Sequence, residues 1–192
     1  MSLSIDPRST ALVLIDLQKG IVSRPLDPHD AKTVVTNSVQ LAQALVKAGG
    51  LIVPVHVGFS PDDGDRLKSP IDQPTPAGAG AMPADWSELV PEIAALGAPI
   101  VIKKRNWSAF HGTELDLQLR RRGIKTMILG GIATNFGVES TARDAWQHGY
   151  DVIIAEDACS SSGGEGMHAF AIEKILPRLA RIRSTNDILA AF

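Results

Sequence analysis

The chain has 192 residues, of which 44% are hydrophobic and 21% are charged, and its formal net charge is −2. This composition is typical of a folded globular chain and excludes the disordered and fibrous classes. The balance of 19 basic and 21 acidic residues leaves no cationic excess to neutralise phosphates, so we expect no nucleic-acid partner.

Cys159 is the single cysteine, which excludes an internal disulfide and a zinc site built from several thiolates. Such cysteine usage is typical of a reducing compartment, and we expect the protein to be cytoplasmic. The first residues lack the basic start and apolar run of a signal peptide. No apolar run reaches the length of about eighteen residues that suggests a membrane span, so no membrane partner is expected.

Short apolar runs of strand length alternate with segments of helical periodicity. A first strand is predicted at 10–15, and a helical pattern over 29–48 follows it and stops at Gly49. A second strand is predicted at 51–57, where Pro54 removes one ladder hydrogen bond.

Residues 58–97 are rich in proline, glycine and aspartate, and we predict a long excursion over the functional end of the domain. A short helix is expected within it, near 85–95. The remaining predicted elements are strands at 99–103, 126–129, 151–155 and 180–183, and helices at 113–122, 136–148, 165–176 and from 185 onward.

This alternation predicts one α/β domain over residues 1–192, with a parallel sheet between two layers of helices. Ligands of such open sheets bind beyond the carboxyl ends of the strands. We therefore expect the chemistry among the polar residues and glycine-containing turns that follow the apolar runs. These are Asp16, Lys103, Lys104, the turn at 131–137, and the pair Glu156 and Asp157.

Four blocks of sequence, in order, resemble the isochorismatase-like hydrolases of the cysteine hydrolase superfamily. They are ALVLIDLQ at 11–18, KRNWSAF at 104–110, GIATNFGVESTARDA at 131–145 and AEDACS at 155–160. The resemblance extends over nearly the whole chain. It implies a Rossmann-like, three-layer α/β/α fold with a six-stranded parallel sheet in the order 3-2-1-4-5-6. It also implies no cofactor, and a homodimer or homotetramer whose subunits contribute to one another's pocket rim.

The resemblance also implies roles for five residues. Asp16 matches the family's acid or base, and Lys104 matches its lysine. Ile132 and Ala133 match a non-proline cis peptide bond that turns backbone amides toward the ligand. Gly137 stands where most members carry the nucleophilic cysteine. The amides near Ala133 and Gly137 match an oxyanion hole, a role that needs no thiol.

Glycine at position 137 cannot form the thioester through which cysteine hydrolases cleave amides and nitriles. The isochorismatases proper resemble this chain in having glycine there. They protonate the methylene carbon of a vinyl ether with the aspartic acid, and water then adds to the cation. Asp16 would do the same if it held a proton near neutral pH. Desolvation raises its pKa and Lys104 lowers it, and the sequence leaves that balance open.

Two departures from the family pattern limit the substrate. The isochorismatases hold isochorismate with a tyrosine, where this chain has Ala133, and with a glutamine near His56, so isochorismate is not the expected substrate. The stretch from His56 to Asp63 also lacks the Asp-x-His pattern of the nicotinamidase metal site, so no metal is expected. We expect further pocket contacts from six residues, which are Gln18, His56, Trp107, Phe110, Asn135 and Phe136.

Other interpretations stay open at this stage. Trp107 and Phe110 are equally well explained as core residues, and His56 as a structural histidine. The main hypothesis is hydrolysis of a small organic molecule by acid catalysis from Asp16, assisted by Lys104 and backbone amides. The alternatives are an amide hydrolase that activates water and a non-catalytic small-molecule-binding protein. A dinucleotide-binding domain is not supported, because G-x-G-x-x-G does not follow the first strand.

Overall fold

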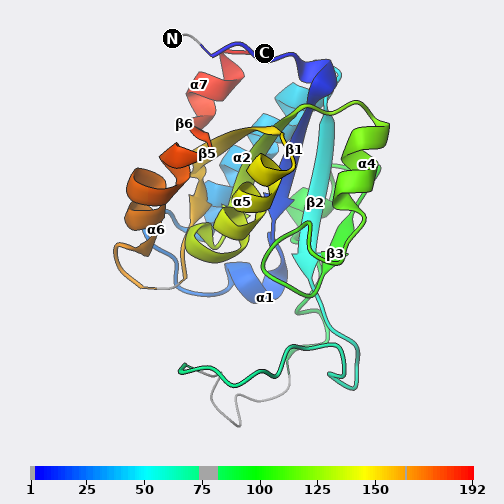
Figure 1. Cartoon of the computed structure of the whole chain (residues 1–192), viewed down its shortest axis with the longest axis vertical. Coiled ribbons are helices and arrows are strands. Elements are labelled where there is room, and N and C mark those ends of the chain that lie inside the picture. Colours follow the sequence, from blue (N-terminus) through cyan, green and yellow to red (C-terminus); the bar gives the residue numbers. More distant parts are fainter. Residues whose placement is uncertain (1–2, 74–81, 163) are drawn as a thin grey trace.

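The computed structural model describes residues 3–73, 82–162 and 164–192, and Figure 1 shows how they are arranged. A six-stranded sheet forms the centre, in the order β3-β2-β1-β4-β5-β6, with every pairing parallel. The predicted sheet and its strand order are confirmed. The strands are β1 (Thr10–Ile15), β2 (Leu51–Val57), β3 (Ile102–Lys104), β4 (Thr126–Ile132), β5 (Asp151–Ser160) and β6 (Arg181–Arg183).

Helices cover both faces of this sheet (Figure 1). Two hydrophobic clusters, one on each face, assign the helices to layers. One layer contains α2 (Ala31–Lys47), α3 (Pro91–Ala94) and α7 (Thr185–Leu189). The other contains α4 (Leu115–Arg121), α5 (Glu139–Gln147) and the run of α6 (Met167–Phe170), η3 (Ala171–Ile175) and η4 (Leu176–Arg178). Three short elements complete the description, namely η1 (Pro7–Ser9), α1 (Lys19–Val22) and η2 (Thr134–Val138).

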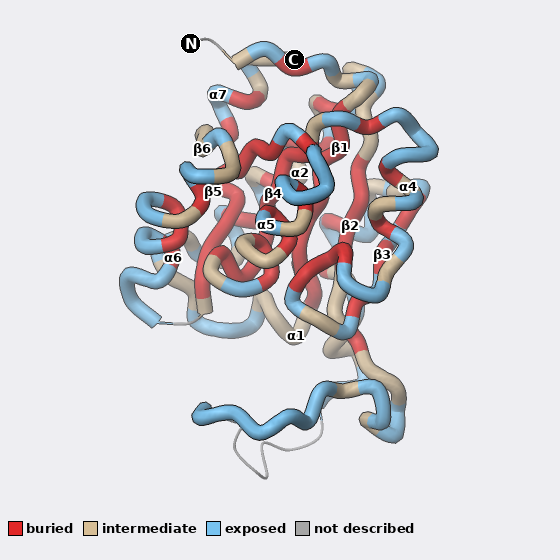
Figure 2. The backbone as a smooth tube through the Cα atoms, in the orientation of Figure 1, coloured by how far each residue is buried: buried red, intermediate tan, exposed pale blue. Residues whose placement is uncertain are grey.

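Strand β1 lies in the middle of the sheet and is buried along its whole length (Figure 2). Successive side chains of a strand point to opposite faces, which divides β1 between the two clusters. Leu12 and Leu14 pack on the α2 side, whereas Val13 and Ile15 pack on the α4 and α5 side. A strand in this central position therefore requires a continuous apolar run, and the chain leaves it at residue 16.

Pro54 lies within β2 without interrupting the sheet. The carbonyl of Val55 accepts from the Asp16 amide, so the backbone groups of Val55 face β1. Those of Pro54 then face the other side, where pairing with β3 starts only at Val55. The missing N–H of proline therefore costs no hydrogen bond.

Several element bounds differ from the sequence-based prediction. Strand β3 is not 99–103, and it includes both Lys103 and Lys104, which were expected to follow it. Strands β4 and β5 extend beyond 129 and 155, because their pairing resumes past an irregularity at Leu129 and Gly131. The predicted helix at 136–148 starts as the π-helical turn η2, and the helix predicted at 165–176 is divided into three short segments. The helix expected near 85–95 is only the four-residue α3.

The described part of the predicted excursion leaves the sheet at the carboxyl end of β2 (Figure 1). Its residues 74–81 lie outside the described part of the chain. An ion pair of 2.8 Å between Arg105 and Asp65 holds its outgoing limb. Backbone bonds from Lys19 to Glu88 and from Gly20 to Trp86 hold its return. Within the ranges that the structure describes, no helix is long and apolar enough to cross a bilayer.

Candidate functional site

Asp16 is the first residue beyond β1, and its backbone is in the left-handed region with φ of 53°. Such a conformation costs a non-glycine residue roughly 1–3 kcal/mol, which the surrounding structure must supply. The amide of Asp16 donates to Val55 at 2.8 Å, which ties the turn to β2. On its other side β1 pairs with β4, so Asp16 lies where the strand order reverses, the usual ligand position of such sheets.

Lys104 ends β3, and its side chain reaches past β2 to Asp16. The lysine Nζ and the Asp16 Oδ2 are 2.8 Å apart, within the roughly 4 Å expected for charges that shift each other's pKa. The side chains are only 2% and 9% exposed, so this ion pair is shielded from water. Nζ also donates to the Asn106 carbonyl at 3.1 Å, which fixes the lysine from a second direction.

Burial raises the pKa of Asp16 to about 6, against the opposing effect of the Lys104 charge and hydrogen bond. The balance that the sequence leaves open therefore favours desolvation. The two carboxylate oxygens are not equivalent, since Oδ2 accepts from Lys104 while the buried Oδ1 has no partner among the described residues. A proton on Asp16 therefore belongs on Oδ1, which Lys104 does not engage.

Replacing Lys104 by methionine is expected to raise the pKa of Asp16 well above 6. The substitution removes the principal group that lowers this pKa and leaves the burial in place. A carbon-13 NMR titration of the aspartate carboxyl groups measures the change. Lys103→Met is the matched control, because Lys103 is exposed on the other face of β3 and should leave the Asp16 titration unchanged. A fall in the Asp16 pKa of the Lys104 variant would contradict the assigned pairing.

The turn after β4 faces the Asp16 carboxylate. Its Ile132–Ala133 peptide bond is cis, and η2 follows directly. Gly137 in this turn is buried, and a Cβ placed on it would lie 3.3 Å from the Asp16 Oδ2 and 2.9 Å from the Ile15 Cγ2. The backbone of the turn thus lies directly against the carboxylate, at a distance that leaves little room for any side chain at position 137.

Two aromatic rings flank Gly137 at the surface. Trp107 and Phe136 are 64% and 37% exposed, and their ring centroids are 4.9 Å apart. Asn135 lies in the same turn, where its Oδ1 accepts from Ser161 at 2.6 Å, and its buried Nδ2 has no acceptor in the part of the chain that is described. The predicted pocket residues 107 and 136 therefore lie beside Gly137, whereas Asn135 belongs to the same turn but its side chain contacts Ser161.

Comparison with known proteins agrees with this fold. Residues 10–187 match the family model described as the isochorismatase domain. The chain belongs to the isochorismatase family. It is 49% identical over 188 residues to the uncharacterized family protein YwoC of Bacillus subtilis, covering 98% of this chain and 96% of that protein.

Two further relatives support the isochorismatase assignment. The uncharacterized family protein YecD of Escherichia coli O157:H7 is 47% identical over 189 residues, covering 98% of this chain and 99% of YecD. A solved structure of an isochorismatase family protein from Burkholderia thailandensis superposes with a TM-score of 0.89 at 39% identity. That match covers 100% of this chain and 98% of the other.

Two expected pocket residues of this isochorismatase-family chain have structural roles instead. Gln18 is fully buried, and its amide donates to the carbonyls of Val57 and Trp86 and accepts from the Val57 amide. Since these bonds occupy its polar atoms, Gln18 joins β2 to the returning excursion and does not face a ligand. Phe110 is 8% exposed and packs in the core against the rings of His148 and Tyr150, at the other end of α5 from Gly137.

His56 is half-buried, and its Nδ1 lies 2.8 Å from the Ser87 carbonyl and 3.0 Å from the Ser87 hydroxyl. Burial lowers its pKa, with the nearby cations of Lys103, Lys104 and Arg105 acting in the same direction. These contacts fit the structural interpretation of His56, which holds the excursion against β2, and do not place it against Asp16.

Cys159 is completely buried in β5, where its Sγ lies 3.9 Å from the Leu129 carbonyl. Burial raises the pKa of the thiol far above its usual value, so the reactive thiolate is not formed near neutral pH. The isochorismatase scaffold of this chain therefore has a structural cysteine at position 159.

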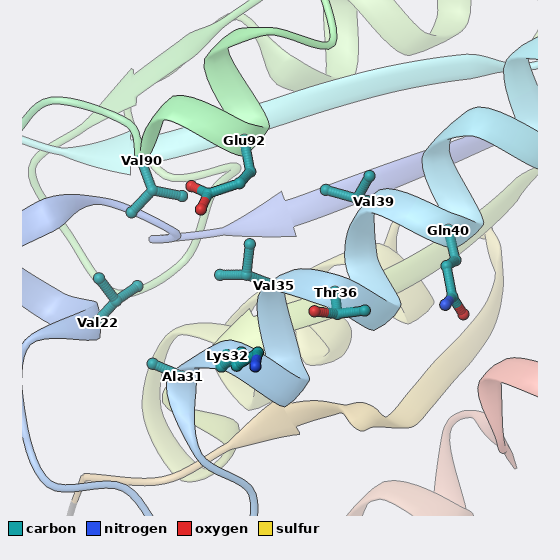
Figure 3. A pocket seen from close by; sticks show the side chains of 9 residues that line it. All are labelled: Val22, Ala31, Lys32, Val35, Thr36, Val39, Gln40, Val90 and Glu92. Carbon is teal, nitrogen blue, oxygen red and sulfur yellow. The ribbon is translucent and has the colours of Figure 1, made fainter.

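An open groove of about 440 Å³ lies away from this site, between α2, α1 and α3 (Figure 3). Its walls are mostly apolar, and it contains neither Asp16 nor Lys104. The lining residues are Val22, Ala31, Lys32, Val35, Thr36, Val39, Gln40, Val90 and Glu92. Across the described ranges, no three His, Cys, Asp or Glu side chains gather where they would hold a metal ion.

Sequence reasoning missed three contributors to the site. They are the Asn106 carbonyl that accepts from Lys104, the Ile15 methyl against Gly137, and the bond between Thr134 and His168. The first two follow from backbone directions that become known only with the fold. The third joins residues that are 34 positions apart, and the sequence around neither residue indicates that the two are in contact.

Proposed function

We propose that this isochorismatase-family chain hydrolyses a small organic molecule by acid catalysis from Asp16, without a covalent intermediate. One observation carries the proposal: the Oδ1 of Asp16 is buried and unpartnered, and the pKa of this carboxyl is raised to about 6. A general acid is most effective when its pKa lies near the working pH. Gly137, standing where most members carry cysteine, offers no thiol for covalent catalysis.

For a vinyl ether, the proposed first step moves the Oδ1 proton of Asp16 to the methylene carbon and leaves an oxocarbenium ion. Water then adds to the cationic carbon and returns a proton to Asp16. The resulting hemiketal loses the alcohol and becomes a carbonyl compound, so one water is consumed and Asp16 is regenerated. Lys104 holds the aspartate while it is anionic, because the ammonium hydrogen-bonds Oδ2 throughout.

Backbone amides of the 133–137 turn complete the proposed site by donating hydrogen bonds that orient a polar group of the substrate. The exposed pair of Trp107 and Phe136 offers an apolar wall to the part of the substrate that does not react. The hydrolysed molecule is accordingly small and partly apolar, and it binds with its reactive group toward Asp16.

A second candidate is amide hydrolysis by activated water. It is favoured by a relative, the ureidoacrylate amidohydrolase RutB of Acinetobacter baylyi, which is 29% identical over 212 residues and covers 100% of this chain and 86% of RutB. In that reaction Asp16 would act first as a base, so its anionic form would be the active one. The two candidates therefore predict opposite dependence on pH around 6.

The purified protein, screened against vinyl ethers, amides and nitriles, is expected to hydrolyse a member of the first class, and iodoacetamide should not reduce the rate. The reason is that Cys159 is fully buried and its thiol stays protonated. Mass spectrometry of the protein during turnover should show no covalent adduct. Inactivation by alkylation at Cys159 that substrate prevents would contradict the mechanism. Tight binding with no turnover across the panel would favour the binding-protein alternative.

A further inference from the structure

His168, in α6, is a buried histidine that contacts the turn opposite Asp16. It is 5% exposed, and its Nδ1 lies 2.8 Å from the Oγ1 of Thr134, which is fully buried. Thr134 follows Ala133 directly and opens η2. The histidine therefore contacts the turn from the side of α6, at the residue next to the expected oxyanion amide.

The protonation state of His168 determines which atom donates and which accepts in the hydrogen bond with Thr134. Burial lowers its pKa to about 4, the nearby His29 acts in the same direction, and Asp27 opposes them. The ring of His29 stands edge-on to it, with centroids 5.6 Å apart. At neutral pH the ring is therefore uncharged, and we assign Nδ1 as the acceptor of the Thr134 hydroxyl, with the proton on Nε2.

Side-chain bonds secure the turn at two further points. Ser161 donates to the Asn135 Oδ1 at 2.6 Å, and Ser161 itself is paired with Asp27 through two backbone bonds of 2.9 Å. At the far end of the turn, the Thr141 hydroxyl donates to the Gly137 carbonyl at 2.7 Å. The backbone between residues 134 and 137 is thus anchored at its start and its end, while Gly137 lies against Asp16.

We propose that His168 is a positioning residue that acts through the Thr134 hydroxyl to hold the 133–137 turn over the Asp16 carboxylate. The proposal rests on the proposed function only for its catalytic consequence, since the geometry stands without a substrate. Displacement of a catalytic group by about 1 Å can cost a hundredfold in rate, so such an anchor is useful even though it touches no ligand. The turn also excludes water from Asp16, and this exclusion can be measured directly.

The test is a carbon-13 NMR titration of Asp16 in the intact protein without substrate. Thr134→Val keeps the shape of the side chain and removes the hydroxyl, and His168→Leu removes the acceptor. Each is expected to let water reach Asp16 and to lower its pKa from about 6 by roughly one unit, a tenfold change in proton dissociation. Thr134→Ser and His168→Asn retain a hydroxyl and an acceptor, and both should keep the parent titration.

Thr185→Val is the matched control. Thr185 is 2% exposed and donates its hydroxyl to Asp157 at 2.7 Å, so it loses a comparable buried bond at a different place. It should leave the Asp16 titration unchanged. An unchanged titration in both Thr134→Val and His168→Leu would overturn the proposal, and so would an equal shift in Thr185→Val. With a substrate in hand, kcat should fall in the first two variants while KM stays near the parent value. None of the titrations depends on whether that substrate is found.

Discussion

Asp16→Asn is expected to reduce turnover by about a thousandfold or more, because an amide cannot deliver the proton that the proposed mechanism requires. The substitution keeps an oxygen for Lys104 and nearly the same volume. It nevertheless leaves the lysine charge buried without its counter-charge, which is destabilising. Circular dichroism should therefore accompany the rate measurement. The double variant of Asp16→Asn with Lys104→Met removes both charges and should be folded and equally inactive.

Asp157→Asn serves as the control for the loss of turnover in Asp16→Asn. Asp157 lies in β5, and its Oδ1 accepts from the amide and the hydroxyl of Thr185, each at 2.7 Å. It has no contact with Lys104, so its variant should retain turnover. Full activity of Asp16→Asn would refute the mechanism, whatever the result at Asp157.

The pH dependence of the parent protein follows from the same carboxyl. As a general acid Asp16 must carry its proton, so kcat should fall as the pH rises through about 6. The contribution of Asp16 to the stability of the folded protein also falls as the pH rises. The folded pKa is raised above the unfolded value of 3.8, so this group's contribution to stability is fully present below 3.8 and is lost as the pH rises through about 6. A rate that instead increases through this range would favour Asp16 as a base and the amide-hydrolysis alternative.

The fold was predictable because its signals are local. Each central strand is an apolar run, and burial on both faces explains why β1 needs no polar alternation. The position of Asp16 follows from that same run, since a polar residue after a central strand must emerge at the carboxyl edge. The prediction that Asp16 lies close to Lys104 depended on the family resemblance of two sequence blocks. The two residues are 88 positions apart, and no periodic pattern in the sequence relates them.

The errors in the predicted pocket have a common cause. Gln18 and Phe110 belong to sequence blocks near the site, but proximity along the chain does not determine which way a side chain points. Gln18 turns toward the returning excursion, and Phe110 turns into the core beside α5. The assignment of Asp16 also depended on a physical balance between burial and a neighbouring charge. Only the three-dimensional arrangement decides that balance.

Gly131→Ala is expected to destabilise the protein by more than about 4 kcal/mol, an exceptional cost for the addition of one methyl group. Gly131 has φ of 119°, a conformation that L side chains rarely adopt. An added Cβ would lie 2.1 Å from the Ile15 carbonyl oxygen and 2.6 Å from its amide nitrogen. Both atoms are backbone of a central strand, so neither can move without shifting β1.

Gly149→Ala separates the two causes of this cost. Gly149 also has a positive φ, of 84°, but no atom lies within 4 Å of the position that a Cβ would take. The Gly149→Ala variant should therefore be destabilised only by the strained backbone conformation, by about 1–2 kcal/mol. The free energies of unfolding in urea measure both variants. Because Ile15 immediately precedes Asp16, the Gly131 variant should also displace the acid, and any folded fraction should be inactive. Equal losses of stability at the two glycines would mean that β1 and β4 do not approach each other as closely as the structure places them.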